Sequence, residues 1–575
     1  MAGTSRFLLL ITLLACLAVS ARAEDDFRPL VSAAVRSHAQ RVVIPPGVYR
    51  MAPHGGDRTV WSIDKAHDIV IVADGVTLVS TQLTRAIDLR DCRNVTLQGI
   101  TVDYDPLPFT QGTVTAVAGD KSWVDVKIHA GYPLKAYSRI DVVDPATRIR
   151  KRGMPFLWGS KAVMTGADTV RITREGLGKI ALVGDFISMS TGPDAAGIPH
   201  AVTIDDCAGV IFRNVTVDSA PGMGIIESGG EGGAQYLGCK VAPGPRPAGA
   251  TQDRLLSTSW DAIQTADVRR GPLVEHCLFR DAGDDSWSVQ SSDYLVAKSD
   301  SRHLVIFPRD EYAPGLSPGD RIRTSLDSPE AAILSSSGVS MSSAGLDPAT
   351  FAKLNDAREW SFWKVGHRGW MITLDRDFSA APGTSIYSPD RQCAGFIFRD
   401  NELHSSGRVL IKAGNGLVAG NLLDPSHGLV VNPEVPGQAA AGIRNLVIRD
   451  NTIRGTGFFC PGPFLSQAGA ISITAGMAGG HLRPPGVFED IVIQNNTIDA
   501  VNGPNIVVSS ARNVAIQGNR FIDAQQTPPN NTGRDFGIPN DCVVYVTQST
   551  GVKISGNQFI RPGPYAKNLV VAPAY

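Results

Sequence analysis

The sequence predicts an all-β protein: a right-handed parallel β-helix into which two small, barrel-like all-β domains are inserted. Short segments of alternating apolar residues, each with a Gly or Asn turn and a second short strand, recur along the chain. They include CRNVTLQGITVDY from Cys92, CAGVIFRNVTVDS from Cys207, CAGFIFRDNELHS from Cys393 and NLVIRDNTIRG from Asn445. Self-similarity of this kind, carried on strands, is typical of a solenoid in which each repeat is one coil.

Asparagines at the turns indicate the length of a coil. Asn401 and Asn421 are 20 positions apart, and Asn496 and Asn519 are 23 positions apart. Because asparagine tolerates the left-handed backbone conformation, we expect these residues to adopt it at the corners between strands. Leucine-rich repeats have a similar period, but the sequence has neither their leucine pattern nor their helical segment.

The pattern divides the chain into six segments. We expect an export signal over residues 1–23, an N-terminal cap with the first coils over 24–110, a first inserted domain over 111–198, coils with the candidate catalytic residues over 199–294, a second inserted domain over 295–389, and C-terminal coils over 390–575. The cap is predicted as an amphipathic helix between Phe27 and Gln40, because a terminal repeat must cover the open end of the core. Gly184-Asp185-Phe186-Ile187 and Gly319-Asp320-Arg321-Ile322 share a pattern, which indicates that the two inserted domains are related.

The first residues have the organisation of an export signal. Arg6 supplies a positive charge, the segment that follows it is almost entirely apolar, and Ala21-Arg22-Ala23 has the form of a cleavage site. Leu13-Leu14-Ala15-Cys16 loosely resembles a lipoprotein box, so anchoring through Cys16 is the alternative to cleavage. No later segment is long and apolar enough to span a membrane. We therefore expect an exported protein, periplasmic or secreted, without a transmembrane segment.

Composition excludes several kinds of partner and site. The formal net charge of −1 argues against nucleic acid or an anionic membrane as the main partner. There are eight cysteines and no CxxC pair, which disfavours a metal cluster or a disulfide framework. We expect the cysteines near strand starts to pack inside the coils as small hydrophobes. No cofactor and no resident metal are predicted, and a homodimer stays open.

The candidate catalytic residues are Asp261, Asp284 and Asp285. Asp261 and Asp284 are 23 positions apart, which is one coil. Parallel strands stack at about 4.8 Å, so carboxylates at matching positions would lie roughly 5 Å apart. Glycoside hydrolysis uses two carboxyl groups at about 5–5.5 Å for retention or about 6.5–9.5 Å for inversion. A solvated Gly-Asp-Asp turn and a Ca²⁺ site are the alternatives that the residues leave open.

Several neighbours are candidates for substrate binding. Trp260 and Trp287 flank the carboxylates and would stack on sugar rings, although either could instead belong to the core. Arg408 and Lys412 share one strand face in RVLIK and would reach substrate, or else lie on a charged outer face. The second inserted domain begins directly after Asp285, so we expect it to wall one side of the site.

The chain resembles glycoside hydrolase family 110, the exo-acting α-1,3-galactosidases. The resemblance rests on Ser259-Trp260-Asp261-Ala262-Ile263-Gln264, on Asp284-Asp285-Ser286-Trp287-Ser288-Val289-Gln290 and on the stretch from Asp103 to Gly112. It covers most of the mature chain, and all three aspartates match. The family's flanking Asn, Gly and His positions are replaced here, among others by Gln264 and Gln290, which the resemblance places against the sugar.

The resemblance implies an exported, exo-acting, inverting hydrolase that removes a terminal α-linked sugar from an oligosaccharide or polysaccharide. It implies Asp284 as general acid and Asp261 with Asp285 as the base that activates water. Two other classes stay open. One is a polygalacturonase-like hydrolase or a polysaccharide lyase, and the other is a non-catalytic β-helix that binds glycans.

Overall fold

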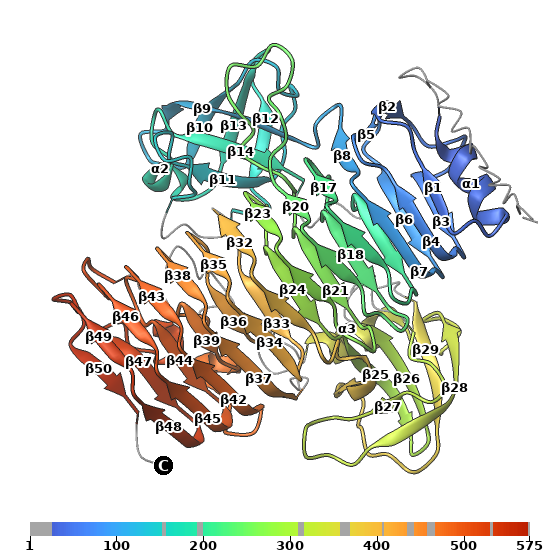
Figure 1. The fold of residues 1–575 in the computed structure, drawn as a ribbon. Coiled ribbons are helices and arrows are strands. Elements are labelled where there is room, and N and C mark those ends of the chain that lie inside the picture. The colour runs from blue at the N-terminus through green and yellow to red at the C-terminus, as the bar shows by residue number, and fades with distance from the viewer. Residues whose placement is uncertain are drawn as a thin grey trace, which may run out of the picture.

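The computed structural model describes residues 26–151, 157–191, 199–308, 315–356, 368–404, 407–433, 442–456, 466–529 and 533–572. The expected export signal, Cys16 included, lies outside the described residues. The chain winds into coils, and each coil contributes one strand to each of three parallel sheets (Figure 1). Each of these sheets has 12 strands. The predicted right-handed parallel β-helix is confirmed.

The three sheets are named here by the order in which a coil visits them. Sheet 1 consists of β1 (Arg41–Val43), β4 (His67–Val72), β7 (Arg93–Gln98), β16 (Ile211–Arg213), β19 (Gln235–Leu237), β22 (Leu273–Glu275), β31 (Ile397–Arg399), β34 (Gly416–Ala419), β37 (Ile443–Arg449), β42 (Phe488–Gln494), β45 (Ala511–Gln517) and β48 (Thr550–Ser555). Sheet 2 consists of β2 (Gly47–Met51), β5 (Val76–Ser80), β8 (Thr101–Tyr104), β17 (Thr216–Val217), β20 (Lys240–Val241), β23 (Leu278–Arg280), β32 (Glu402–His404), β35 (Leu422–Leu423), β38 (Thr452–Arg454), β43 (Thr497–Asp499), β46 (Arg520–Ile522) and β49 (Gln558–Ile560). Sheet 3 consists of β3 (Thr59–Asp64), β6 (Arg85–Arg90), β15 (Val202–Asp205), β18 (Ile225–Ser228), β21 (Ile263–Ala266), β24 (Trp287–Gln290), β33 (Val409–Lys412), β36 (Leu429–Val431), β39 (Ile471–Ile473), β44 (Ile506–Ser509), β47 (Cys542–Thr547) and β50 (Asn568–Val571).

The core runs along the inside of the coils. Alternate residues of each strand point inward, and the parallel register stacks them on their equivalents in the next coil. In β37 and β42, for example, Leu446 pairs with Ile491 and Ile448 with Ile493, and all four are buried. One continuous cluster of buried side chains therefore links the first coil to the last.

A ladder of asparagines lines the inside of the corner between sheets 1 and 2. Each side-chain amide donates to the Oδ1 atom of the next asparagine at 2.9–3.0 Å. The ladder consists of Asn401, Asn421, Asn451, Asn496, Asn519 and Asn557. The expectation that these asparagines adopt the left-handed conformation is wrong, because the residue before each of the six has the positive φ. The left-handed residue forms the bend, and the asparagine after it turns its side chain inward to bond along the stack.

Cysteines occupy similar inward positions near strand starts. Cys92, Cys207, Cys277 and Cys393 are buried, as predicted, and the cysteines described by the structure are free thiols. Cys277 is bonded to the first asparagine of the ladder, because its backbone N–H donates to Asn401 Oδ1 at 2.9 Å.

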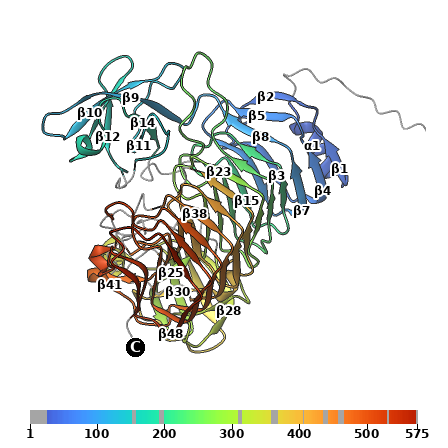
Figure 2. The same cartoon turned by 60° about the vertical axis from the view of Figure 1, so that its left-hand side comes forward.

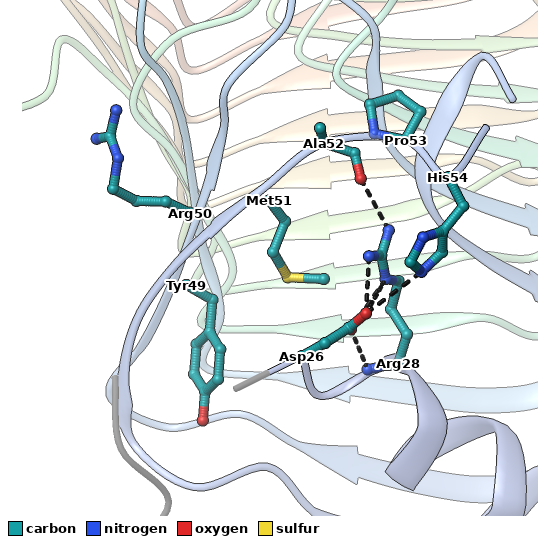
Figure 3. Close-up of a pocket in the computed structure, with 8 residues that line it drawn as sticks. All are labelled: Asp26, Arg28, Tyr49, Arg50, Met51, Ala52, Pro53 and His54. Carbon is teal, nitrogen blue, oxygen red and sulfur yellow. Dashed lines mark hydrogen bonds and ion pairs between the residues drawn. The ribbon is translucent and has the colours of Figure 1, made fainter. Parts of the chain in front are cut away.

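A short helix caps the N-terminal end, as the sequence predicted. Helix α1 (Arg28–Arg36) follows Phe27, whose ring meets Trp61 edge-on at a centroid distance of 4.9 Å. Arg28 connects the cap to the coils, because its Nη1 atom donates to the carbonyl oxygen of Ala52 at 2.9 Å (Figure 3). The same atom donates to the carbonyl oxygen of Val60 at 2.7 Å. Asp26 pairs with the same guanidinium at 2.7 Å.

Two antiparallel six-stranded sheets interrupt the coils (Figures 1 and 2). The first insertion contains β9 (Phe109–Val117), β10 (Trp123–Ile128), β11 (Arg139–Val143), β12 (Lys161–Met164), β13 (Thr169–Thr173), helix α2 (Leu177–Ile180) and β14 (Phe186–Ser190). The second contains β25 (Asp293–Asp300), β26 (His303–Pro308), β27 (Arg321–Ile322), β28 (Ala331–Val339), helix α3 (Pro348–Asp356), β29 (Gly369–Leu374) and β30 (Ser385–Tyr387). Smaller elements are the 3₁₀ turns η1 (Pro389–Arg391), η3 (Ala478–Gly480) and η4 (Arg534–Phe536), and the hairpin of β40 (Gly476–Met477) and β41 (His481–Leu482).

The two insertions share one topology. Their sheet orders are β11-β14-β9-β10-β13-β12 and β27-β28-β29-β26-β25-β30, and an Arg323–Tyr387 bridge joins β27 to β30. All five strand pairings of the first insertion therefore recur at the corresponding strands of the second, while the pairing of β27 with β28 is found in the second insertion alone among the described strands. The shared Gly-Asp pattern is not at equivalent places, however, because Asp185 precedes the sixth strand of the first insertion and Asp320 precedes the third strand of the second.

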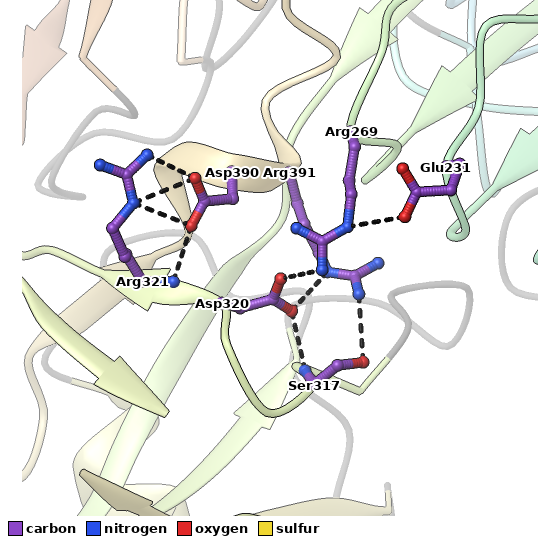
Figure 4. Close-up of polar contacts among 7 residues, drawn as sticks. All are labelled: Glu231, Arg269, Ser317, Asp320, Arg321, Asp390 and Arg391. Atoms are coloured by element: carbon purple, nitrogen blue, oxygen red, sulfur yellow. Dashed lines mark hydrogen bonds and ion pairs between the residues drawn. The ribbon is translucent and has the colours of Figure 1, made fainter. Parts of the chain in front are cut away.

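The insertions leave the coils at different corners. The first lies between β8 of sheet 2 and β15 of sheet 3, and the second lies between β24 of sheet 3 and β31 of sheet 1. They therefore stand at opposite ends of the strands of sheet 3 (Figure 1). A buried ion-pair cluster attaches the second insertion to the coils: Asp320 accepts from Arg269 and Arg391, both at 2.6 Å (Figure 4).

Candidate active site

Asp261 and Asp285 occupy matching positions on consecutive coils. Ile263 of β21 pairs with Trp287 of β24, and each aspartate lies two residues before its strand. The backbone continues the ladder at this corner, because Ala262 N–H donates to Asp285 O at 2.9 Å. Asp284 is stacked on Trp260 in the same way, with its N–H donating to Trp260 O at 3.2 Å. The three aspartates thus come together where sheet 2 turns into sheet 3.

The three carboxyl groups are close enough to act as one group. One oxygen of each lies within 4.8 Å of an oxygen of the others. Asp261 and Asp285 are buried, with 6% and 4% exposure, whereas Asp284 is half-buried. Among the three, Asp284 is therefore the carboxyl group that solvent reaches most easily.

Arg408 holds Asp285 from the following coil. Its Nε and Nη2 atoms donate to the two carboxylate oxygens at 2.7 and 2.8 Å, and its Nη1 atom donates to Gln467 Oε1 at 2.9 Å. Both partners of this ion pair are buried. A bidentate guanidinium stabilises the charged carboxylate, so Asp285 is held ionised and in one orientation.

Asp261 is in the opposite electrostatic situation. Its burial, and then the neighbouring carboxylates of Asp285 and Asp284, raise its pKa well above the ordinary value. Ser288 acts against this shift, since its Oγ donates to Asp261 Oδ2 at 2.8 Å. Three carboxyl groups this close do not all ionise, and the surroundings put the retained proton on Asp261.

His427 lies in the same row as Asp261 and Asp285. The register of β24, β33 and β36 places Gly407 next to Asp285 and His427 next to Gly407. Gly407 has no room for a side chain, because a Cβ there would overlap the backbone carbonyl of Asp284. Burial and the nearby Arg150 and Arg408 lower the pKa of His427 well below its ordinary value, so it is neutral.

The first insertion, rather than the second, covers this corner. Arg139 of β11 is buried and donates to Ser259 O, and its guanidinium lies 5.0 Å from the ring centroid of Trp158. Arg150 donates to the carbonyl oxygen of Ala282, two residues before Asp284. The expectation that the second insertion walls the site is wrong, because the second insertion leaves the coils at the other end of β24.

The outer face of sheet 3 carries a polar network that begins at Asp261. Ser288 Oγ lies 3.3 Å from Gln264 Oε1, and Gln290 Nε2 donates to Gln264 Oε1 at 2.6 Å. Lys412 Nζ in turn donates to Gln290 Oε1 at 3.2 Å. The structure thus brings Gln264, Gln290, Arg408 and Lys412 together beside the aspartates, as candidates for substrate contact.

The two tryptophans that flank the aspartates in sequence lie in different surroundings. Trp260 is half-buried beside the site, where its ring meets His200 edge-on at 6.2 Å and its Nε1 donates to Thr191 O at 3.4 Å. Trp287 is fully buried and stacks on Phe398 at a centroid distance of 4.5 Å. The prediction that Trp287 contacts substrate is therefore wrong. It is the first residue of β24, and the strand's alternation directs it into the core.

The stretch from Asp103 to Gly112 has a structural use. Asp103 is buried and accepts two hydrogen bonds from Arg254, both at 2.8 Å, while Asp105 pairs with Arg50 at the surface. These pairs join the start of the first insertion to the neighbouring coils.

Three functional candidates were missed at the sequence level. Arg139 and Arg150 lie more than 100 positions before the aspartates, and nothing in the local pattern connects them to the site. His427 lies in Pro425-Ser426-His427-Gly428, whose composition is that of a turn, so the residue does not stand out as functional. A signal for it existed, because it lies 20 positions after Gly407, which is one coil.

Comparison with known proteins does not assign a family. No protein-family model matches the chain, and no curated protein is similar to it. The solved structures that align with it include the mannuronan C-5 epimerase A-module of Azotobacter vinelandii, at 10% identity and a TM-score of 0.32, covering 96% of this chain and 97% of that one. They also include the catalytic domain of a GH87 α-1,3-glucanase, at 10% identity and a TM-score of 0.41, covering 96% and 68%. A family 28 exopolygalacturonase of Yersinia enterocolitica aligns at 10% identity and a TM-score of 0.35, covering 93% and 75%.

These similarities are too weak to transfer any property to this chain, so its function has to be argued from its own site.

In the part of the chain that the structure describes, no helix has the length and apolar character needed to cross a membrane.

Proposed function

We propose that the protein is a glycoside hydrolase in which Asp261, Asp284 and Asp285 carry the reaction. The observation that supports this is the carboxylate triad itself, with one oxygen of each residue within 4.8 Å of the others. A bidentate arginine holds one member ionised, and burial keeps another protonated. Carboxyl groups in contrasting protonation states are what acid–base hydrolysis of a glycosidic bond requires.

We assign Asp284 as the general acid, because it is the most exposed of the three and lies beside Trp260. When substrate binds, the retained proton moves from Asp261 to Asp284, which leaves Asp261 ionised. Asp284 then donates this proton to the glycosidic oxygen as the bond from that oxygen to the anomeric carbon breaks. A water molecule attacks the anomeric carbon and passes a proton to the pair formed by Asp261 and Asp285. After one turnover the proton therefore resides on the buried pair, which is the state that the raised pKa of Asp261 favours.

We infer inversion of configuration. A retaining reaction needs a carboxylate oxygen free to bond to the anomeric carbon. Both oxygens of Asp285 accept from Arg408, and Asp261 is buried with its Oδ2 atom accepting from Ser288, so neither is suited to be that nucleophile. The short spacing of the carboxyl oxygens resembles that of retaining enzymes, which makes the configuration of the first product a decisive measurement.

An α-linked terminal sugar of the galactose type is the proposed substrate, on the resemblance of the three aspartate segments. The residues beside the aspartates differ from the family's pattern at Gln264 and Gln290, and these two side chains hydrogen-bond to each other at 2.6 Å. The amide pair would present one donor–acceptor edge to sugar hydroxyl groups. Specificity among α-linked sugars is therefore expected to depend on this pair.

The experiment is a panel of aryl α- and β-glycosides and of α-1,3-linked galactosyl oligosaccharides, assayed with the wild type and with Asp284→Asn. We expect the wild type to release one terminal α-linked sugar, and the variant to lose at least about 10³-fold in kcat. ¹H NMR of the first product reports its anomeric configuration. The assay is run with and without a chelator, and equal rates are expected because Arg408 and Arg139 already neutralise the carboxylates.

Three outcomes would contradict the proposal. Equal turnover by Asp284→Asn would remove this residue from the chemistry. An ultraviolet-absorbing unsaturated product together with loss of rate in chelator would indicate a metal-dependent lyase. Glycan binding without turnover by the wild type would make the triad a binding site.

A further inference from the structure

A polar cavity lies between the second insertion and the coils. Its volume is about 240 Å³, and it is lined from the insertion by Arg321, Arg323, Glu330 and Tyr387, and from the coils by Gly414 and Arg444, among others. It is separate from the aspartates. Arg408 and Gly414 lie at opposite ends of β33, and six residues of extended strand span about 20 Å.

The charges in this cavity do not cancel. Arg321 pairs with Asp390 and Glu330 at 2.5 and 3.1 Å, and Arg323 pairs with Glu330 at 2.5 Å. Two guanidinium groups thus share two carboxylates. Among the described residues, the guanidinium of Arg444 has no hydrogen bond or ion pair, although the residue is only partly exposed. The cavity therefore carries one uncompensated positive charge.

Hydrogen-bond donors without partners, like the uncompensated positive charge, indicate that the cavity binds an anionic ligand. Arg323 Nε and Gln392 Nε2 are buried N–H donors, and within the described structure neither has a partner. Both residues line the cavity. Buried polar groups are nearly always paired, so donors without acceptors indicate that an acceptor-rich group belongs beside them. A carboxylate matches this requirement, because it accepts from several donors and fits a guanidinium in a two-point contact.

The second insertion places an arginine at this cavity in the same way as the first insertion places one at the aspartates. Arg139 is the first residue of the third strand of its insertion, and Arg321 is the first residue of the third strand of the other. Each of these strands faces the coils, the first beside the carboxylate triad and the second beside the cavity. Between the two places, the outer face of sheet 3 presents the polar chain of Gln264, Gln290 and Lys412.

We propose that the cavity around Arg444 is a second carbohydrate subsite, which binds the carboxylate of an acidic sugar in the same glycan chain that the aspartates cleave. The inference rests on the proposed hydrolase function and narrows its substrate to glycans that carry uronic acid residues. The site acts at a distance of several sugar units from the bond that breaks, so it affects binding of the chain rather than the chemical step.

The test is calorimetric titration of the full-length protein with galacturonate and glucuronate oligosaccharides, and with their neutral galactose and glucose counterparts. We expect the acidic oligosaccharides to bind more tightly than the neutral ones, and Arg444→Ala to lose about 10-fold or more of that affinity. Sodium sulfate serves as a competitor. Weak competition is expected for a carboxylate subsite, and displacement at equal concentration would instead indicate a general anion site and overturn the assignment to a sugar.

Two further variants keep the result interpretable. Arg449→Ala removes an arginine from the same strand, β37, but that residue pairs with Asp450 outside the cavity, so unchanged affinity is expected. Arg444→Lys keeps the charge but loses the two-point contact, and an intermediate affinity is expected. Unfolding temperatures of both Arg444 variants should equal that of the wild type, since the guanidinium of Arg444 has no partner among the described residues.

The failure of this inference is distinguishable from failure of the proposed function. If Arg444→Ala binds acidic oligosaccharides as the wild type does while Asp284→Asn abolishes turnover, the second subsite is wrong and the hydrolase stands. If affinity depends on Arg444 but no glycan is cleaved, the cavity binds acidic sugars and the hydrolase is wrong.

Discussion

The guanidinium of Arg408 donates to both carboxylate oxygens of Asp285, at 2.7 and 2.8 Å, from the next coil of the solenoid. The two residues are 123 positions apart, because the whole second insertion lies between them. Their contact fixes the orientation and the charge of one carboxylate of the candidate active site. It is also a buried ion pair, so its removal has consequences for both stability and turnover.

We predict that Arg408→Met destabilises the protein by about 3–5 kcal/mol, because it removes the guanidinium that pairs with the buried charge of Asp285. Arg408→Lys should retain part of that stability but lower kcat by at least about 10-fold, since an ammonium group cannot make the two-point contact. Urea unfolding and steady-state kinetics measure the two effects. Arg399→Ala is the control. It also removes an arginine that pairs with a carboxylate on the neighbouring coil, Glu275, but that pair is exposed and its loss should cost less than about 1 kcal/mol.

We predict that Ser288→Ala shifts the alkaline limb of the pH profile to higher pH. The triad must retain one proton to act, so kcat/KM falls as pH rises through the raised pKa of Asp261. The hydrogen bond from Ser288 lowers that pKa, so its removal raises the pKa further and extends activity toward alkaline pH. The control is Ser286→Ala, because Ser286 donates to the carbonyl oxygen of Gly407 instead. A limb that stays in place in Ser288→Ala would show that Asp261 does not hold the essential proton.

We predict that the two tryptophans respond differently to substitution. Trp287→Ala should destabilise the fold by about 3–5 kcal/mol, since it removes a buried ring that stacks on Phe398. Trp260→Ala should raise KM with little loss of stability, because its ring is half-buried beside the carboxylates. Thermal unfolding and kinetics on the same samples separate the effects. A raised KM in the conservative Trp287→Phe variant, at unchanged stability, would restore Trp287 as a substrate contact.

We predict that a buried glutamate makes stability depend on pH. Glu227 points into the core from β18, where burial raises its pKa to about 7 and Thr265 Oγ1 donates to it at 3.3 Å. The unfolded chain releases this proton near its ordinary pKa of 4.5, but the folded protein keeps it until about pH 7. The free energy of unfolding therefore decreases between about pH 4.5 and pH 7, by roughly 3 kcal/mol from this group.

Glu227→Gln checks this prediction, because the amide cannot ionise. Its free energy of unfolding should lack the decrease over that pH range, and the variant should exceed the wild type in stability above pH 7. Urea unfolding at a series of pH values measures both. Parallel pH curves for the two proteins would mean that Glu227 ionises in the folded state without penalty.

The architecture could be predicted because the repeat is local. Each coil repeats the same alternation of apolar residues and a small or polar corner residue. Segments such as those from Cys92 and Cys207 therefore predict the stacked coils without knowledge of long-range contacts. The conformation of the corner asparagines was not predictable in the same way. Asparagine is suited both to a left-handed bend and to a ladder of inward side chains. The ladder forms because each side chain hydrogen-bonds to the next asparagine along the stack, such as Asn421 and Asn451.

The repeat pattern is sufficient to predict a solenoid with two β insertions, in which Asp261 lies one coil before the pair Asp284–Asp285. The spacing of the strands then requires their carboxyl groups to be close. The groups that surround these carboxyl groups could not be read from the repeat. Arg139, Arg150 and His427 arrive from other coils and from the first insertion, while Trp287 turns into the core. Stacking within the solenoid follows a short period that repeats along the chain, whereas the place where an insertion packs depends on contacts between residues more than 100 positions apart.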